Sequence, residues 1–191
     1  APLAKILAES VVGAELRGAT VDRKAVCHSC QYKFLGGGGD INNDGINDLL
    51  IGAHYGYGGW GRAYVIHGKI SGWTKNLDLG AVSSIVGEHV SSDFGYRVDI
   101  PGDVNGDNID DLLIGAEHVG RPYTGSGAAY IIFGRAEGWW GSNTSVTGLA
   151  SASFLGEAKN DYAGSAAHGA GDVNGDGLAD ILIGAHNHVQ D

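Results

Sequence analysis

The feature that most constrains the fold is a segment that occurs three times along the chain. The copies cover residues 39–53, 102–116 and 171–185, and each ends in a run of Leu and Ile followed by Gly-Ala. Their first aspartates stand 63 and then 69 residues apart. Long repeats of this kind form supersecondary units that bury their cores against one another. The sequence therefore predicts a row of stacked units.

Each unit offers about four short β-branched or aromatic runs separated by glycine-rich turns. Glycine makes up 34 of the 191 residues, far above its usual share of about 7%. Residues 49–51 are apolar at consecutive positions, which is typical of a strand that is buried on both faces. We therefore expect an all-β fold in which four antiparallel strands form each blade.

The repeats divide one continuous segment, residues 1–191, into three parts. We place them at about 11–80, 81–149 and 150–191, with an insertion at 17–31 and a truncated third copy. The chain is thus expected to begin and end inside blades. The insertion holds the two cysteines, Cys27 and Cys30, for which a local disulfide is favoured over free thiols. Asn143 begins an Asn-X-Ser triplet, which makes it a candidate glycosylation site.

The charge balance and the hydropathy exclude some classes of partner. The formal net charge is −10, whereas nucleic-acid binding requires a basic surface. No apolar run reaches the roughly 18–20 residues that a membrane-spanning helix needs.

The sequence contains no methionine and starts at Ala1, which fits either a removed leader or an internal start. We expect an extracellular or cell-surface protein, with the periplasm as an alternative.

Each repeated segment contains a nine-residue loop with Asp or Asn at positions 1, 3, 5 and 9. Carboxylates and amides at alternate positions of a tight loop gather the hard oxygen ligands that Ca²⁺ prefers. Position 7 is expected to contribute its backbone carbonyl. The predicted ligands are Asp40, Asn42, Asp44, Ile46 and Asp48 in the first loop, Asp103, Asn105, Asp107, Ile109 and Asp111 in the second, and Asp172, Asn174, Asp176, Leu178 and Asp180 in the third.

Two simpler interpretations of these loops were weighed. Asp, Asn and Gly also build turns without any metal, but three copies with acidic or amide residues at all the ligand positions favour metal binding. An EF-hand requires a glutamate at position 12, where this chain has Ile51, Ile114 and Ile183. The prediction is about three Ca²⁺ ions with a structural role.

Together these motifs resemble the FG-GAP repeat of integrin α-subunit β-propellers. The resemblance rests on Asp93-Phe94-Gly95, on residues 102–116 and on the strand-like run 129–131. Related repeats occur in fungal propeller lectins, in a GPI-specific phospholipase and in bacterial surface proteins. The resemblance implies propeller-type blades of four antiparallel strands with Ca²⁺ between two strands of a blade. Two departures stand out, because the family's Pro of Gly-Ala-Pro is replaced by His54, Glu117 and His186, and Phe-Gly becomes Tyr162-Ala163.

No catalytic signature is found, and we predict a protein that is not an enzyme. The G-x-G-x-x-G segment at 56–61 is followed at once by a strand-like run, so it is interpreted as a turn and not as a dinucleotide site. His186 and His188 are interpreted as surface residues.

The expected function is calcium-dependent adhesion or self-assembly at a cell surface. The alternatives are a propeller lectin and an accessory module of a larger extracellular enzyme. The expected partners are a protein or glycan ligand, together with a homo-oligomer or filament, or further blades of a longer chain. Trp60, Trp139 and Trp140 are candidate ligand contacts, although packing between blades is the favoured explanation of these aromatic residues.

Overall fold

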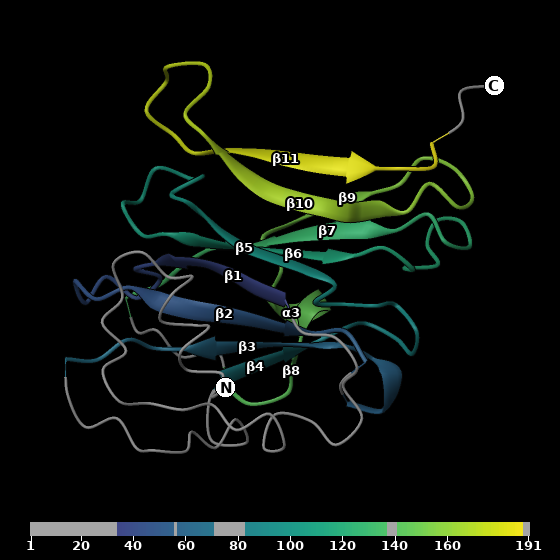
Figure 1. The fold of residues 1–191 in the computed structure, drawn as a ribbon, viewed down its shortest axis with the longest axis horizontal. Coiled ribbons are helices and arrows are strands. Elements are labelled where there is room, and N and C mark those ends of the chain that lie inside the picture. Colours follow the sequence, from purple (N-terminus) through teal and green to yellow (C-terminus); the bar gives the residue numbers. More distant parts are fainter. Residues whose placement is uncertain (1–33, 56, 71–82, 137–140, 189–191) are drawn as a thin grey trace, which may run out of the picture.

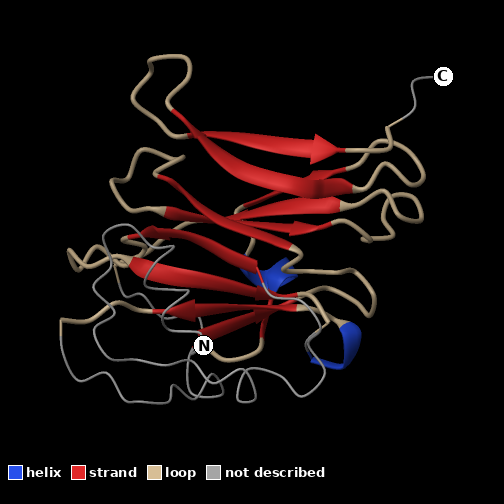
Figure 2. Cartoon of the chain, in the orientation of Figure 1, coloured by secondary structure: helices blue, strands red, loops and turns tan. Residues whose placement is uncertain are grey.

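Three β-sheets stacked face to face make up the computed structural model, which describes residues 34–55, 57–70, 83–136 and 141–188 (Figure 1). Figure 2 shows that strands and loops dominate and that the helices are single short turns. The predicted all-β class is confirmed. Within the described residues, neither helix has the length and hydrophobicity needed to cross a bilayer.

The first sheet contains four strands that pair antiparallel in chain order, and a fifth short strand that pairs in parallel with the fourth. A short 3-10 helix, η1 (Tyr57–Gly59), lies between the second and third strands. The strands are β1 (Phe34–Gly39), β2 (Asp48–Ala53), β3 (Arg62–Ile66), β4 (Ser83–Val86) and β8 (Thr144–Ser145).

The second sheet has the predicted four antiparallel strands, and the third has two. A single helical turn, α3 (Val146–Leu149), connects β8 to the last strand of the second sheet. The second sheet consists of β5 (Arg97–Gly102), β6 (Asp111–Ala116), β7 (Ala128–Ile132) and β9 (Ala152–Leu155), and the third of β10 (Ala163–Gly171) and β11 (Asp180–Ala185). These antiparallel sheets, with FG-GAP-type signatures in the sequence, are blades of a propeller.

The sheets are out of step with the sequence repeats. The strand at 83–86 falls at the start of the second predicted repeat, yet it pairs with β3 and is the fourth strand of the first sheet. The connection at 87–96 then carries the chain across to the second sheet. Each junction between sheets is therefore built from residues of two successive repeats.

The central strands are buried on both faces, as their consecutive apolar residues predicted. Every residue of β2 and of β6 is buried. Because side chains alternate across a strand, Leu112 and Ile114 pack into the core between the first and second sheets. Leu113 points the other way and packs with Ala129, Ile131 and Ala167 against the third sheet.

Glycines allow the sheets to approach one another closely at each junction. A Cβ atom at Gly52 would overlap the carbonyl oxygen of Gly95, and one at Gly115 would overlap that of Gly164. Gly95 and Gly164 have φ values of +84° and +80°, in the left-handed region that favours glycine. The glycine near the end of a central strand thus packs directly against the backbone at the start of the next sheet.

The substitution Gly115→Ala should therefore lower the free energy of unfolding by about 1–3 kcal/mol, because the added methyl group forces the second and third sheets apart. Gly120→Ala is the matched control, since no atom lies within 4 Å of the Cβ position there. The control should change stability by no more than about 0.5 kcal/mol. Urea unfolding in saturating calcium measures both, and equal effects would contradict the proposed close approach.

Candidate metal-binding loops

The three acidic loops lie at the same edge of the stack, on the left in Figure 1. They connect β1 to β2, β5 to β6 and β10 to β11, so each follows the first strand of its sheet. The strand after each loop starts with the position-9 aspartate.

Hydrogen bonds within each loop follow one repeated pattern. In the second loop, the backbone N–H of Asn108 donates to Asp103 Oδ2 over 2.6 Å. The N–H of Asp107 donates to Asp103 Oδ1, and that of Ile109 donates to Asp107 Oδ1, over 3.2 and 2.9 Å. The first and third loops make the same three bonds. The repeated sequence therefore builds the same local structure three times.

Position 6 of each loop requires a left-handed backbone. Gly45 and Gly177 have φ values of +81° and +91°, and Asn108 takes the same region at +65° in the middle copy. Asparagine is among the few non-glycine residues that adopt this conformation readily.

Ionisation of the position-1 aspartates of the second and third loops is favoured by the loop geometry. Burial opposes ionisation of Asp103, but the N–H groups of Asn108 and its neighbours outweigh this effect and lower the pKa. In the third loop, the N–H of Gly177 is the main cause of the lowered pKa of Asp172. These carboxylates are therefore in the charged form that a cation requires.

The position-9 aspartates of the first two loops are fully buried. The carboxylate of Asp111 accepts the N–H of Val104 at the start of its loop and the N–H of Gly134 after β7, over 2.8 and 2.9 Å. Asp48 makes the equivalent bonds to Ile41 and Gly68. Burial raises the pKa of Asp111 to about 6. The two N–H groups oppose this rise, and the nearby carboxylates Asp107 and Asp103 add to it. A buried charge with two neutral donors still benefits from a cation.

The donor set fits Ca²⁺, which binds carboxylate, amide and carbonyl oxygens. In the described structure, however, the three carboxylates of a loop are not gathered within 4.8 Å of one another. The amide of the position-3 asparagine donates instead to the position-5 carboxylate, at 3.0–3.1 Å in all three loops. A bound cation would replace this hydrogen bond and draw the loop closed. The ligand assignments remain predictions.

Neighbouring loops are joined directly by backbone hydrogen bonds. Asp110 N–H donates to the carbonyl of Asp40, and Ala179 N–H donates to that of Asp103, over 3.1 and 2.8 Å. Asp110 also accepts the N–H of Asp40 at 2.8 Å. Position 8 of the second and third loops therefore contacts position 1 of the preceding loop. A change that orders one loop is expected to stabilise the neighbouring loop as well.

The structure also brings together a set of residues that the sequence did not predict as a site. Glu117 and His118 follow β6 at the end opposite its acidic loop, and Asp93 lies in the connection from β4 to β5. The three ligand atoms all lie within 4.8 Å of one another. In the sequence, Asp93 is the residue before the Phe-Gly signature, and Glu117 stands where the family has a proline. Neither position belongs to a local metal-binding pattern, so the sequence did not predict this cluster.

The remaining predicted residues are scattered. Trp60 is 37% exposed in the turn after η1, and its carbonyl accepts the Ser92 hydroxyl at 3.0 Å. No α-helix follows the G-x-G-x-x-G segment, because β3 begins at Arg62, so its interpretation as a turn is confirmed. Asn143 is exposed beside β8, with its N–H bonded to Ser84 Oγ. Cys27, Cys30, Trp139 and Trp140 lie outside the described residues.

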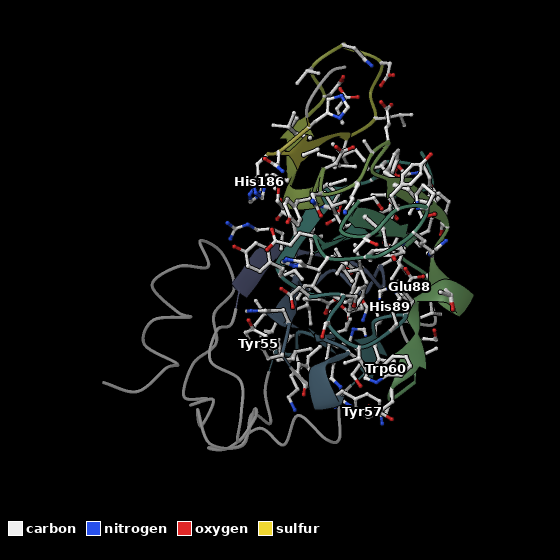
Figure 3. All side chains as sticks on the ribbon, turned by 90° about the vertical axis from the view of Figure 1, so that its right-hand side faces the viewer. Tyr55, Tyr57, Trp60, Glu88, His89 and His186 are labelled. Atoms are coloured by element: carbon white, nitrogen blue, oxygen red, sulfur yellow. The ribbon has the colours of Figure 1, made fainter. Side chains whose placement is uncertain are left out.

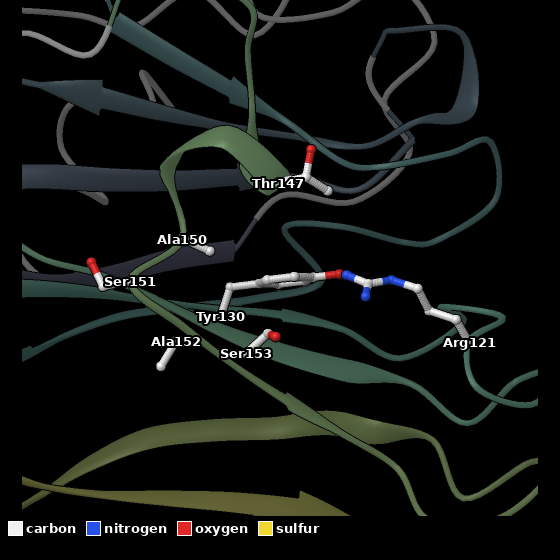
Figure 4. A pocket seen from close by; sticks show the side chains of 7 residues that line it. All are labelled: Arg121, Tyr130, Thr147, Ala150, Ser151, Ala152 and Ser153. Carbon is white, nitrogen blue, oxygen red and sulfur yellow. The ribbon is translucent and has the colours of Figure 1, made fainter.

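A cavity of about 480 Å³ lies against the outer strands of the second sheet (Figure 4). Its lining includes the hydroxyl-bearing residues Thr147, Ser151 and Ser153, together with Arg121. Tyr130 also lines it, and burial raises the pKa of its hydroxyl well above the usual range. Arg121 is held by Glu88 through hydrogen bonds of 2.7 and 2.8 Å.

Comparison with known proteins agrees with this fold of stacked antiparallel blades. The FG-GAP repeat family matches residues 94–132 and 163–190. Phosphatidylinositol-glycan-specific phospholipase D of Bos taurus is 34% identical over 154 residues, which is 76% of this chain and 17% of that protein. Integrin alpha-E of Mus musculus is 33% identical over 155 residues, 78% of this chain and 13% of that protein.

The chain contains FG-GAP repeats and is related to integrin α-chains and to phosphatidylinositol-glycan-specific phospholipase D. A further relative, integrin alpha pat-2 of Caenorhabditis briggsae, is 36% identical over 83 residues, 43% of this chain and 7% of that protein. The chain thus spans less than a fifth of the length of these relatives.

The raised pKa of Asp111 predicts a specific pH dependence in calcium-free buffer. Between about pH 4 and pH 6 the folded state holds a proton that the unfolded state has released, so the free energy of unfolding should fall as the pH rises. The effect has an upper limit of about 3 kcal/mol. Asp111→Asn cannot titrate, so urea unfolding at several pH values should show a shallower slope for the variant than for the wild type. Parallel profiles for the two proteins would contradict the assignment.

Proposed function

We propose that the chain is a calcium-stabilised module of an extracellular or cell-surface protein, the periplasm being the alternative, and that it acts by binding in adhesion or self-assembly without catalysis. The observation that carries this proposal is the repetition of one loop structure, with one set of hydrogen bonds, at the same edge of three stacked sheets. The extracellular or cell-surface location is favoured by the relatives of the chain, which include integrin α-chains and a phospholipase specific for phosphatidylinositol glycans.

Calcium supports this function by relieving repulsion within the loops. Three carboxylates in each loop repel one another, and they contribute to the net charge of −10. With dissociation constants of about 10⁻⁴–10⁻³ M and millimolar calcium, each of the three ions stabilises the fold by roughly 0.4–1.4 kcal/mol. The position of the loops at the end of buried strands suits a structural ion.

The third sheet supports assembly with further blades. Among the described residues, the outer edge of β11 has no pairing strand. Leu182 on β11 is 64% exposed, whereas Ile181 and Ile183 on the same strand pack toward the second sheet. An apolar face beside an open strand edge favours the addition of another sheet. Further blades of a longer chain, or a second copy that forms a homo-oligomer or filament, would cover it.

Light scattering after gel filtration tests self-assembly. The wild type in millimolar calcium should exceed the 19.7 kDa of one chain, and chelation should return it to that mass. Leu182→Lys should stay monomeric in calcium, because the charge disrupts the outer face of the third sheet. Val90→Lys is the matched control at another exposed apolar residue, 54% exposed in the connection between β4 and β5, and it should still assemble. A wild type of about 20 kDa in both buffers would exclude self-assembly.

Glycan binding is the second candidate function, favoured by the cavity beside Tyr130 and by exposed aromatic residues. Tyr57, Trp60 and Tyr123 are 52%, 37% and 52% exposed, and aromatic faces stack on sugar rings. A glycan array probed with the wild type and with Trp60→Ala tests this function, with Phe154→Ala as the control at another exposed aromatic residue. Binding that is lost only in the Trp60 variant would establish a lectin. The role of accessory module to an extracellular enzyme is supported only by the phospholipase relatives.

A further inference from the structure

The edge opposite the calcium loops holds the second set of ligand-type side chains, Asp93, Glu117 and His118. Figure 3 looks onto this edge, which is on the right in Figure 1. Since β6 runs from Asp111 to Ala116, Glu117 and His118 stand at the far end of the strand that begins at the calcium loop. Asp93 reaches them from the connection between the first and second sheets.

The separations of these atoms match those of ligands on one small cation. Nδ1 of His118 lies 3.0 Å from Oδ2 of Asp93 and 3.8 Å from Oε1 of Glu117. Ligands bound to Zn²⁺ at about 2.0–2.2 Å in tetrahedral geometry are roughly 3.3–3.6 Å apart. The oxygens of Asp93 and Glu117 lie within 4.8 Å of each other, so side-chain adjustments without a change of backbone would place all three atoms around one ion.

The state of Glu117 points independently to a ligand. The residue is 9% exposed, and among the described residues no N–H or O–H group donates a hydrogen bond to its carboxylate; its ion-pair partner is His118, at 3.8 Å. Burial raises the pKa of Glu117, with the charge on His118 opposing this and that on Asp93 adding to it. A largely buried carboxylate that no protein group donates to loses part of its hydration, and a bound cation compensates for that loss.

We propose that Asp93, Glu117 and His118 bind one Zn²⁺ ion at the junction between the first and second sheets. One imidazole nitrogen and two carboxylate oxygens form a mixed set that suits Zn²⁺, whereas Ca²⁺ is bound by oxygen alone. The ion fixes the connection that carries Asp93 to the end of β6 and leaves a coordination position open to water or to a group from a partner.

Neighbouring aromatic rings hold His118 in place. The ring of Tyr162 contacts that of His118 edge-on, with centroids 5.2 Å apart, and stacks on His186 at 5.1 Å. These ring contacts limit the orientations that are open to the His118 imidazole. Tyr162 stands at the aromatic position of the altered Phe-Gly signature, so this departure from the family pattern contributes to the site.

The next junction repeats only part of this arrangement. His188 Nδ1 lies 3.2 Å from Asp161 Oδ2, as His118 does from Asp93. His186 stands at the position equivalent to Glu117, but its ligand atoms are not gathered with that pair. We therefore expect one Zn²⁺ site among the described residues and not two.

Titration calorimetry with ZnSO₄ in millimolar calcium tests the proposal, because the calcium loops are then saturated. The titrations use a Cys27→Ser/Cys30→Ser variant, so that thiols bind no zinc, and wild type is run alongside. One Zn²⁺ per chain is expected, with at least tenfold weaker binding for Glu117→Gln and for His118→Ala. His168→Ala is the matched control, since His168 pairs with Asp99 at 3.6 Å on the exposed face of β10 without a third ligand.

Thermal unfolding gives a second readout that a purely structural role for Glu117 does not predict. In chelator, Glu117→Gln should be at least as stable as wild type, because a buried charge is removed. With zinc, the wild type and His168→Ala should rise in melting temperature while Glu117→Gln stays unchanged. Absence of zinc binding, equal binding by all variants, or binding of calcium in place of zinc would overturn the proposal.

Discussion

The buried carboxylates of Asp48 and Asp111 are the constraint on which each sheet depends. Each carboxylate stands at the start of the second strand of its sheet and accepts two hydrogen bonds. One comes from the start of the acidic loop and the other from the residues that follow the third strand, so the carboxylate holds these three segments together. Asp180 in the third sheet keeps the bond to its loop and is only partly buried. The buried charge at the base of an acidic loop is what makes a cation favourable there.

Close contact between sheets then carries this order along the stack. Glycines at the ends of β2 and β6 admit the backbone of the next sheet, and the loops themselves are linked through Asp110 and Ala179. Because every residue of β2 and of β6 is buried, the two sheets that contain these strands need a neighbour on either side. The two ends of β6 thus carry different side chains, with an acidic loop at one end and a histidine beside two carboxylates at the other.

Local patterns predicted much of this architecture. The alternation of apolar runs and glycine turns indicated the antiparallel strands, and the spacing of acidic residues located the loops, including the left-handed backbone at Asn108. The pairing of β8 with β4 was not predicted, because a two-residue strand at 144–145 has no pattern of its own. The meeting of Asp93 with Glu117 also depends on how two sheets dock, and sequence spacing does not record such contacts.

The most direct test of the account is the number of calcium ions that one chain binds, measured by titration calorimetry from the metal-free protein. The account predicts three ions for the wild type and two for Asp107→Ala, which removes a ligand of the second loop. Glu157→Ala, at an exposed acidic residue outside the loops, should keep all three. A chain that binds no calcium, or an Asp107→Ala variant that binds as many ions as the wild type, would contradict the central claim.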